Sequence, residues 1–402
     1  MMNSKFEDIV FACIEDRDIV SRKAHYTWAR RCGIDLLLKL VILFLNSIGM
    51  RSTGCDCIFV DEVNNSNMRN NLGRTAEEIK GQEAVFLSFY SRKVNHLKVG
   101  YCWPILATIR LLTSSVFAVV SFIGSSDKTN LALSRILVKN MQSYLQRLPS
   151  STSFILMTDH HFYSTVIAMS GLGKTVVLQH GLIQDARFFS PVRADYLYTW
   201  SGKSAKLAAD EKAVVSGTYK FGINGDYLKQ KTRNLKEARN VLLLLSTSVS
   251  VSQIIDRISP IIRLKEEYGF DLGIKTHPGS LFSIKDLQRA VGNCTDIKLY
   301  KEEFIEDIQF DFAFIEQSTA VIDVACLGIP FIIIDETPKS YFSSYIGLLP
   351  IACTESELLD LAVNFNAEKY TSAYIELLNN EICYGSCRIK ELLMCHSGDT
   401  SV

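Results

Sequence analysis

The sequence predicts an α/β protein with two halves in tandem, each containing a parallel β-sheet. From about residue 150 onward, short apolar runs alternate with helix-like segments, which is typical of strands joined by helical crossovers. A polar, charged segment at residues 224–240 interrupts this alternation, which restarts at Val241. The 402 residues are enough for two domains of ordinary size, each with its own core.

In the first half, apolar runs predict strands and the segments between them predict helices. The expected strands are 154–158, 175–179, 194–200 and 213–217, and the expected helices are 161–171 and 201–211. Residues before about 150 mix apolar runs with polar loops such as 64–73 and show no regular alternation. The first sheet is therefore best defined by its later strands.

The second half repeats the pattern with longer apolar runs. The expected strands are 241–247, 270–275, 297–301, 311–317 and 329–335, and the expected helices are 252–269, 283–293 and 318–328. Pro260 lies inside the first of these helices and predicts a kink or a break there. We place the domains at 1–232 and 233–360, and we expect helices at 361–402 to pack back on the first domain.

The composition limits the class of partner. Lys+Arg and Asp+Glu both number 43, so the net charge is zero, which argues against nucleic acid as a partner because phosphate backbones require a basic face. The 11 cysteines are an odd number scattered through a long chain, which indicates a reduced, cytoplasmic protein. Two denser groupings lack the paired spacing of a zinc site: Cys55 with Cys57, and Cys383, Cys387 and Cys395 with His396. We expect no bound metal.

Two apolar stretches raise the question of membrane contact. Residues 33–50 are interrupted by Lys39 and residues 104–124 by Arg110, so neither provides about 20 uninterrupted apolar residues for a span. We interpret both as core or membrane-facing helices. The N-terminal residues are acidic where a secretory signal would be basic. Peripheral contact with the inner face of a membrane remains open.

The stretch SGLGKTVVLQHG, Ser170–Gly181, contains GKT, which also ends a nucleotide-binding P-loop. A P-loop needs a glycine at the position of Ala168, a preceding strand and a following helix. Here the order is reversed, because a helix-like segment precedes GKT and an apolar strand follows it. We therefore predict that Gly171 and Gly173 end a helix and lead into a strand, with no ATP site.

His180 and Gly181 follow that strand directly. Loops at the carboxyl ends of parallel strands are where α/β proteins bind ligands, and a glycine beside an imidazole allows close approach. An imidazole near its ordinary pKa can accept a proton from a hydroxyl. His180 is thus a candidate general base, and a structural histidine at a strand end is the alternative. Asp159, after strand 154–158, is a second candidate base.

The second half offers two more groups at strand ends. Lys275 and His277 end the strand 270–275 and suit an anionic phosphate, while Pro278 begins a tight turn that could hold the imidazole. The alternative is a solvated lysine and a turn histidine. Ser318 or Thr319 can cap the helix that follows strand 311–317 and help form an anion site there.

Asp323 follows Ser318 by five residues, which is about one and a half helical turns. At that distance its carboxylate could reach the hydroxyls of a ribose whose phosphate lies at the helix start. The alternative is an exposed helix residue with simple capping upstream. Because the same cap would exist without any ligand, this spacing alone leaves both interpretations open.

These motifs occur in one order that resembles a known family. LQHG, ADYLYTW, VVSG, IKTHP and EQSTAVIDVACLGIPFII together resemble bacterial GT-B glycosyltransferase-like enzymes of surface-polysaccharide synthesis. Similar families are the capsule-type transferases, the CDP-glycerol glycerophosphotransferases and the HP-motif sialyltransferases. The resemblance covers about residues 150–340. It implies a GT-B-like fold, in which two Rossmann-like domains face each other across a cleft, with the acceptor on the N-terminal domain and the nucleotide donor on the C-terminal one.

The resemblance also implies roles for single residues. Lys275, His277, Ser318 and Thr319 would hold the donor phosphate, Asp323 would bind ribose, and His180 would match the candidate base of the glycerophosphotransferase-like enzymes. The acidic motif that supplies the base in the bacterial sialyltransferases is missing here. Its absence argues against a sialyl donor and makes His180 a stronger candidate for the base.

The function implied is a metal-independent glycosyltransferase without a cofactor. Its donor would be a CMP-, UDP- or GDP-linked sugar, and its acceptor a lipid-linked or growing surface glycan of the capsule or O-antigen type. Three alternatives stay open at this point: a CDP-glycerol- or CDP-ribitol-type polyol-phosphate transferase, a nucleotide-sugar epimerase, and a carbohydrate- or nucleotide-binding partner of an assembly complex.

Overall fold

The fold is known from a computed structural model, whose description covers most of the chain beyond residue 150 and parts of the chain before it. The described residues are 57–62, 66–80, 84–88, 93–94, 97–98, single positions between 113 and 148, 150–183, 189, 191–221, 234–246, 251–277, single positions between 285 and 289, 296–300, 304–316, 318–335, 341–383 and 387–397. Apart from Thr113, the apolar stretches 33–50 and 104–124 lie outside these residues, as does Pro278.

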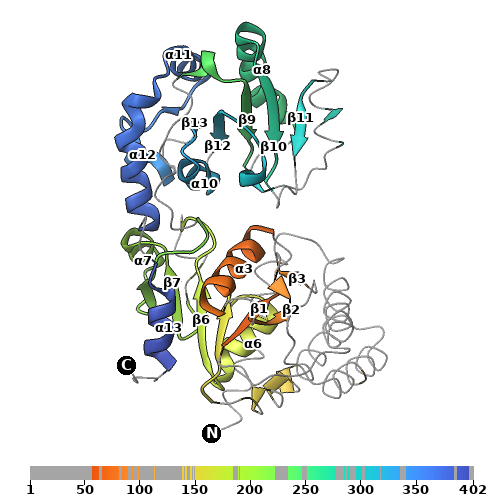
Figure 1. Ribbon diagram of the computed structural model, residues 1–402, viewed down its shortest axis with the longest axis vertical. Helices are drawn as coiled ribbons and strands as arrows, with labels where there is room; N and C mark the ends of the chain where they lie inside the picture. Colours follow the sequence, from red (N-terminus) through yellow and green to blue (C-terminus); the bar gives the residue numbers. More distant parts are fainter. Residues whose placement is uncertain are drawn as a thin grey trace.

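The first lobe is built on a six-stranded parallel sheet with the order β2-β1-β5-β6-β7-β8 (Figure 1). Its strands are β1 (Cys57–Asp61), β2 (Val85–Ser88), β5 (Ser153–Leu156), β6 (Lys174–Leu178), β7 (Tyr196–Thr199) and β8 (Ala213–Val215). Alternate residues along β5 and just after it belong to different apolar clusters: Phe154 and Leu156 to one, Ile155 and the following Met157 to the other. The sheet is therefore packed on both faces, as parallel sheets are.

The second lobe has a parallel sheet of the same size, with the order β11-β10-β9-β12-β13-β14. Its strands are β9 (Asn240–Leu244), β10 (Asp271–Lys275), β11 (Lys298–Tyr300), β12 (Phe312–Glu316), β13 (Phe331–Ile334) and β14 (Ile351–Ala352). The central strands are almost continuous runs of Val, Leu, Ile and Phe, and β12 and β13 are buried throughout. Two parallel α/β sheets in tandem confirm the predicted fold class.

Helices cover both sheets. The α-helices are α3 (Ser66–Lys80), α6 (Phe162–Ser170), α7 (Gly202–Ala208), α8 (Val251–Tyr268), α10 (Ala320–Cys326), α11 (Glu355–Val363), α12 (Ala367–Ile382) and α13 (Ile389–Ser397). The remaining short elements are the hairpin β3 (Lys93–Val94) and β4 (Leu97–Lys98), and the 3-10 turns η4 (Leu235–Glu237), η5 (Ile305–Asp307) and η6 (Tyr341–Tyr345). Although Pro260 lies within it, α8 is continuous, so of the predicted kink or break the break is wrong, and the kink stays a prediction.

The chain returns to the first lobe at its C-terminal end. In Figure 1, α12 runs along the second lobe and α13 lies beside the first. Ile389 and Leu393 of α13 belong to the same apolar cluster as Phe59 of β1, and the Arg388 amide donates to the Ser216 carbonyl at 2.7 Å. At the crossing point, fully buried Glu381 on α12 accepts from Lys203 Nζ of α7 at 2.5 Å and from the Tyr345 hydroxyl at 2.7 Å.

The GKT segment is a helix-to-strand connector, as the sequence predicts. Helix α6 ends at Gly171, whose φ of 63° lies in the left-handed region that glycine tolerates. Lys174 then begins β6 and is exposed. Gly173 lies against the neighbouring strand, because a Cβ built on it would be 2.5 Å from the Thr152 carbonyl oxygen and 2.9 Å from the Phe154 ring.

Gly173→Ala should therefore destabilise the first lobe. A methyl group at this position overlaps a backbone oxygen that cannot rotate away, so β5 and β6 must separate; overpacking of this kind costs about 1–3 kcal/mol. The free energy of unfolding, from urea denaturation, measures the loss. Gly202→Ala is the matched control, since a Cβ there meets nothing within 4 Å. Equal stability of the two variants would contradict the close packing at Gly173.

Among the described helices, none combines the length and apolar character needed to cross a bilayer.

Candidate active site

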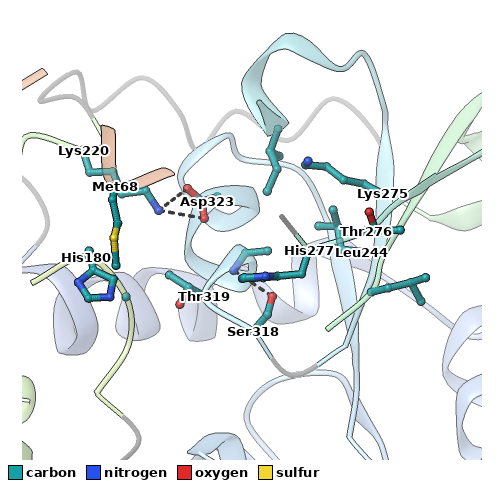
Figure 2. A pocket seen from close by; sticks show the side chains of 14 residues that line it. Met68, His180, Lys220, Leu244, Lys275, Thr276, His277, Ser318, Thr319 and Asp323 are labelled. Carbon is teal, nitrogen blue, oxygen red and sulfur yellow. Dashed lines mark hydrogen bonds and ion pairs between the residues drawn. The ribbon is translucent and has the colours of Figure 1, made fainter. Parts of the chain in front are cut away.

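A cavity of about 260 Å³ lies between the two lobes, at the carboxyl ends of both sheets (Figure 2). The first lobe supplies residues from α3, from the loop after β6 and from the segment after β8. The second lobe supplies the ends of β9 and β10, turn η5 and the start of α10. The described lining residues are Met68, His180, Gly181, Lys220, Leu244, Leu245, Lys275, Thr276, His277, Ile305, Ser318, Thr319, Ala320 and Asp323. Residues separated by more than 100 positions thus meet in one cavity.

His180 faces this cavity from the first lobe. Its Nδ1 lies 3.1 Å from the Met157 carbonyl oxygen, which can only accept, so Nδ1 carries the hydrogen and Nε2 has the free lone pair. Burial is the largest of the effects that together lower the pKa of His180 to about 4; the Met157 hydrogen bond opposes it, and the charges of Lys220 and His161 add to it. The imidazole is therefore neutral at physiological pH and able to accept a proton at Nε2.

This lowered pKa makes stability depend on pH. In the unfolded chain His180 takes up a proton near pH 6.5, whereas in the folded chain it does so only near pH 4. The unfolded state binds more protons between these values, so the free energy of unfolding should fall as pH falls from 6.5 to 4. The expected loss is about 1–2 kcal/mol at pH 5. Urea denaturation of wild type and His180→Asn at pH 7 and pH 5 tests this, and an equal pH effect on both would contradict it.

The loop that carries His180 is fixed by Gln179. The Gln179 side chain accepts from the Trp200 amide at 2.7 Å and donates to the Gly181 carbonyl at 2.8 Å, while its own carbonyl accepts from Trp200 Nε1 at 2.7 Å. Gly181 then passes close to the second lobe, where a Cβ would lie 3.3 Å from Thr319 Oγ1. The next amide, of Leu182, donates to that hydroxyl at 3.2 Å. Close approach between the lobes therefore explains the glycine.

The second lobe presents Lys275, Thr276 and His277 in sequence. Lys275 ends β10 and is only 6% exposed, so its ammonium group approaches the cavity from a largely buried stem. Thr276 is 2% exposed, and its hydroxyl has no hydrogen-bond partner among the described residues. His277 is half-buried, and burial together with the charge of Lys275 lowers its pKa, so this imidazole is also neutral. A buried cation beside an unused hydroxyl favours an anionic, oxygen-rich ligand.

At the start of α10, Ser318 and Thr319 have different partners. Ser318 Oγ accepts from the Ala320 amide at 3.1 Å, whereas the Thr319 side chain caps no helix amide and accepts from Leu182 instead. Each hydroxyl accepts one bond in these contacts and keeps its own hydrogen for a ligand. Ser318 is therefore the residue whose side chain caps the helix, and Thr319 joins the two lobes.

Asp323 has a partner that the sequence did not predict. Lys220 Nζ lies 2.9 Å from Asp323 Oδ1 and 3.3 Å from Oδ2, and the pair crosses from one lobe to the other (Figure 2). Lys220 is only 6% exposed. Lys220 lies five residues beyond β8. A search of the sequence after the carboxyl end of that strand, like the search made after the other strands, would have found it.

Asp159 does not belong to the described lining of the cavity. Its Oδ2 accepts from the amides of Arg193 and Ala194 at 2.5 and 2.9 Å, and Oδ1 lies 3.4 Å from His160 Nε2. A buried carboxylate with two amide donors holds the chain that enters β7, so the structure places Asp159 in a loop-fixing position. Among the described residues, no group of three or more His, Cys, Asp or Glu side chains could hold a metal ion.

Comparisons with known proteins identify the fold. No family model matches the sequence, and no curated protein matches it. Among solved structures, Staphylococcus aureus MnaA with UDP has a TM-score of 0.53 at 11% identity, covering 85% of this chain and 95% of that one. A Listeria monocytogenes protein described as a candidate UDP-N-acetylglucosamine 2-epimerase has a TM-score of 0.50 at 10% identity, covering 86% and 97%.

A third similar structure is the α,α-trehalose 6-phosphate synthase of Burkholderia multivorans, with a TM-score of 0.50 at 8% identity, covering 87% of this chain and 98% of the other. The match covers nearly the full length of all three proteins. Their sequence identities to this chain are nevertheless too low for an activity to be transferred from them. What they establish is architecture: this chain has a two-domain α/β fold of the GT-B type.

Proposed function

We propose that this protein is a glycosyltransferase that moves a sugar from a nucleotide-linked donor, CMP-, UDP- or GDP-linked, to a hydroxyl of an acceptor glycan. One observation supports this most strongly: a neutral imidazole, His180, lines the same cavity as buried Lys275 and Thr276 and half-buried His277, which come from the opposite lobe. One side thus offers a proton acceptor and the other an anion site. Similarity to a structure solved with UDP adds support for a nucleotide donor.

In this proposal the second lobe binds the donor phosphate. Lys275 supplies a charge, and Thr276, His277, Ser318 and Thr319 donate hydrogen bonds to phosphate oxygens. Such donors stabilise the charge that grows on the leaving phosphate as the sugar is transferred. Because the chain itself supplies these groups, we propose that no metal ion or other cofactor is required.

His180 would act on the acceptor. As the acceptor oxygen bonds to the anomeric carbon of the sugar, its proton passes to His180 Nε2, and the bond between that carbon and the phosphate oxygen breaks with its electrons leaving on the nucleotide. With a pKa near 4, His180 of the protein alone is a weak base. A bound phosphate favours the protonated imidazole, so donor binding should raise this pKa toward the working pH.

The acceptor proposed is a lipid-linked or growing surface glycan, as in capsule or O-antigen synthesis, reached at the inner face of the cytoplasmic membrane. Of the alternatives, a nucleotide-sugar epimerase gains support from the similarity to the Listeria protein. It requires the same donor site but no acceptor. A polyol-phosphate transferase would use the same two lobes, with attack on phosphorus in place of carbon.

Thermal shift with CMP, CDP, UDP and GDP tests the donor site directly. We expect one of them to raise the melting temperature more than the others, because binding to the folded state alone stabilises it. The matching nucleotide-sugar, incubated without acceptor, then separates the activities: a transferase releases free nucleotide slowly, and an epimerase produces an altered sugar. If none of the four nucleotides shifts the melting temperature, the proposed donor site is wrong.

A further inference from the structure

The ion pair between Lys220 and Asp323 occupies the wall of the cavity and joins the lobes (Figure 2). Asp323 is the residue that the family resemblance implies as a ribose ligand, and here its carboxylate is already paired with Lys220. We infer that donor binding exchanges these partners: the Lys220 ammonium moves to a donor phosphate, and the released Asp323 carboxylate accepts the ribose hydroxyls. This inference rests on the proposed donor site and adds Lys220 to it as a phosphate-binding residue from the first lobe.

The energetics favour an exchange over a simple separation. The Lys220 side chain is 6% exposed and that of Asp323 is 19% exposed, so leaving the lysine without an anion would be destabilising. A phosphate provides the ammonium with a new anion, and two ribose hydroxyls provide the carboxylate with new donors. Each of the two charges therefore keeps a partner throughout, which a ligand lacking either the phosphate or the ribose could not achieve.

The surroundings of Lys220 leave its head group free to change direction. Its backbone is held on both sides, because its amide donates to Thr218 Oγ1 at 3.0 Å and its carbonyl accepts from Arg74 Nη1. The ammonium lies 4.6 Å from the centre of the Phe221 ring and 5.7 Å from that of Trp200. These aromatic faces stabilise a cation without fixing its direction, and the four-carbon stem is flexible.

Other contacts hold the lobes together independently of this pair. Glu306 on η5 accepts from Arg74 Nη2 at 2.6 Å and from Asn70 Nδ2 at 3.2 Å, both on α3 of the first lobe. Lys203 and Glu381 join the lobes at the α12 crossing. The Lys220–Asp323 pair is thus not required as a latch, and its exchange does not require the lobes to separate.

Binding of inorganic pyrophosphate, which has phosphates but no ribose, tests the exchange by calorimetry at fixed ionic strength. Lys220→Met should weaken binding about tenfold, since a charge-assisted contact is lost. Asp323→Asn should instead tighten it several-fold, because Lys220 no longer has to leave a carboxylate. In the double variant, which retains both side-chain shapes without charge, the tightening should disappear.

UDP and uridine provide the second measurement. Lys220→Met should weaken UDP binding about tenfold while leaving uridine binding equal or tighter, because Asp323 is then free for ribose. If both single variants weaken pyrophosphate alike, the pair is a structural latch and the exchange is wrong. If Asp323→Asn still tightens pyrophosphate binding when Lys220 is also replaced by Met, the tightening comes only from removing a carboxylate that repels the ligand. That result would also overturn the exchange. A wild-type protein that binds none of CMP, CDP, UDP and GDP would refute the proposed donor site itself, which is a separate outcome.

Discussion

His180→Ala is expected to lower turnover by about 10²–10⁴-fold, the usual contribution of a general base. The imidazole is the only titratable group of the first lobe that the described lining offers as a neutral proton acceptor, since Lys220 is a cation. Removing it leaves the acceptor hydroxyl without a base, while the phosphate contacts of the second lobe remain. We therefore expect nucleotide affinity, measured by calorimetry, to change less than threefold.

The matched control for this variant is His161→Ala. His161 precedes α6, is exposed, makes no side-chain capping bond and is absent from the described cavity lining, and its effect on the pKa of His180 is the smallest of the four that act on it. Its turnover should stay within twofold of wild type. If His180→Ala retained full activity, the proposed base would be wrong. If it lost nucleotide affinity and turnover together, His180 would serve binding instead of proton transfer.

Lys275→Met should lower turnover about 10²–10³-fold, which is the effect of removing one preorganised group that stabilises charge in a transition state. Methionine retains the length of the lysine stem, so the 6%-exposed position stays filled. Charge grows on the leaving phosphate during transfer, so kcat should fall by a larger factor than the dissociation constant for UDP rises. Single-turnover kinetics beside calorimetry separate the two quantities.

Lys174→Met provides the control for Lys275→Met, since it is the same substitution at an exposed lysine. Lys174 begins β6, so it lies at the opposite end of its sheet from the cavity. It should leave both kcat and UDP affinity unchanged. A Lys275 variant that bound UDP and turned over like this control would show that the ammonium group does not contact the donor.

Much of the fold could be predicted from local sequence. Buried parallel strands read as continuous apolar runs, and β9, β12 and β13 were recognisable for that reason. Gly171 was recognisable as the end of a helix because its left-handed φ favours glycine. The continuity of α8 through Pro260 was not predictable, because a local preference against proline can be outweighed by tertiary packing.

The candidate site was predictable where it follows the strands. Side chains just beyond the carboxyl ends of parallel strands converge, which is how His180, Lys275 and His277 could be assigned to one cavity. The same rule also selected Asp159, whose carboxylate is instead held by the amides of Arg193 and Ala194. Strand ends identify a region of the molecule, and they do not say which side chains there are already satisfied.

By itself, then, the sequence determined two parallel α/β lobes and the strand ends from which ligand contacts come, because apolar periodicity and turn chemistry act between near neighbours in the chain. Only the tertiary structure determined which groups interact and which are buried. Lys220 pairs with Asp323, the Leu182 amide donates to Thr319, and burial keeps His180 neutral. These contacts join residues up to 137 positions apart. Hydrogen bonding, ion pairing and desolvation depend on distance in space, which no local pattern records.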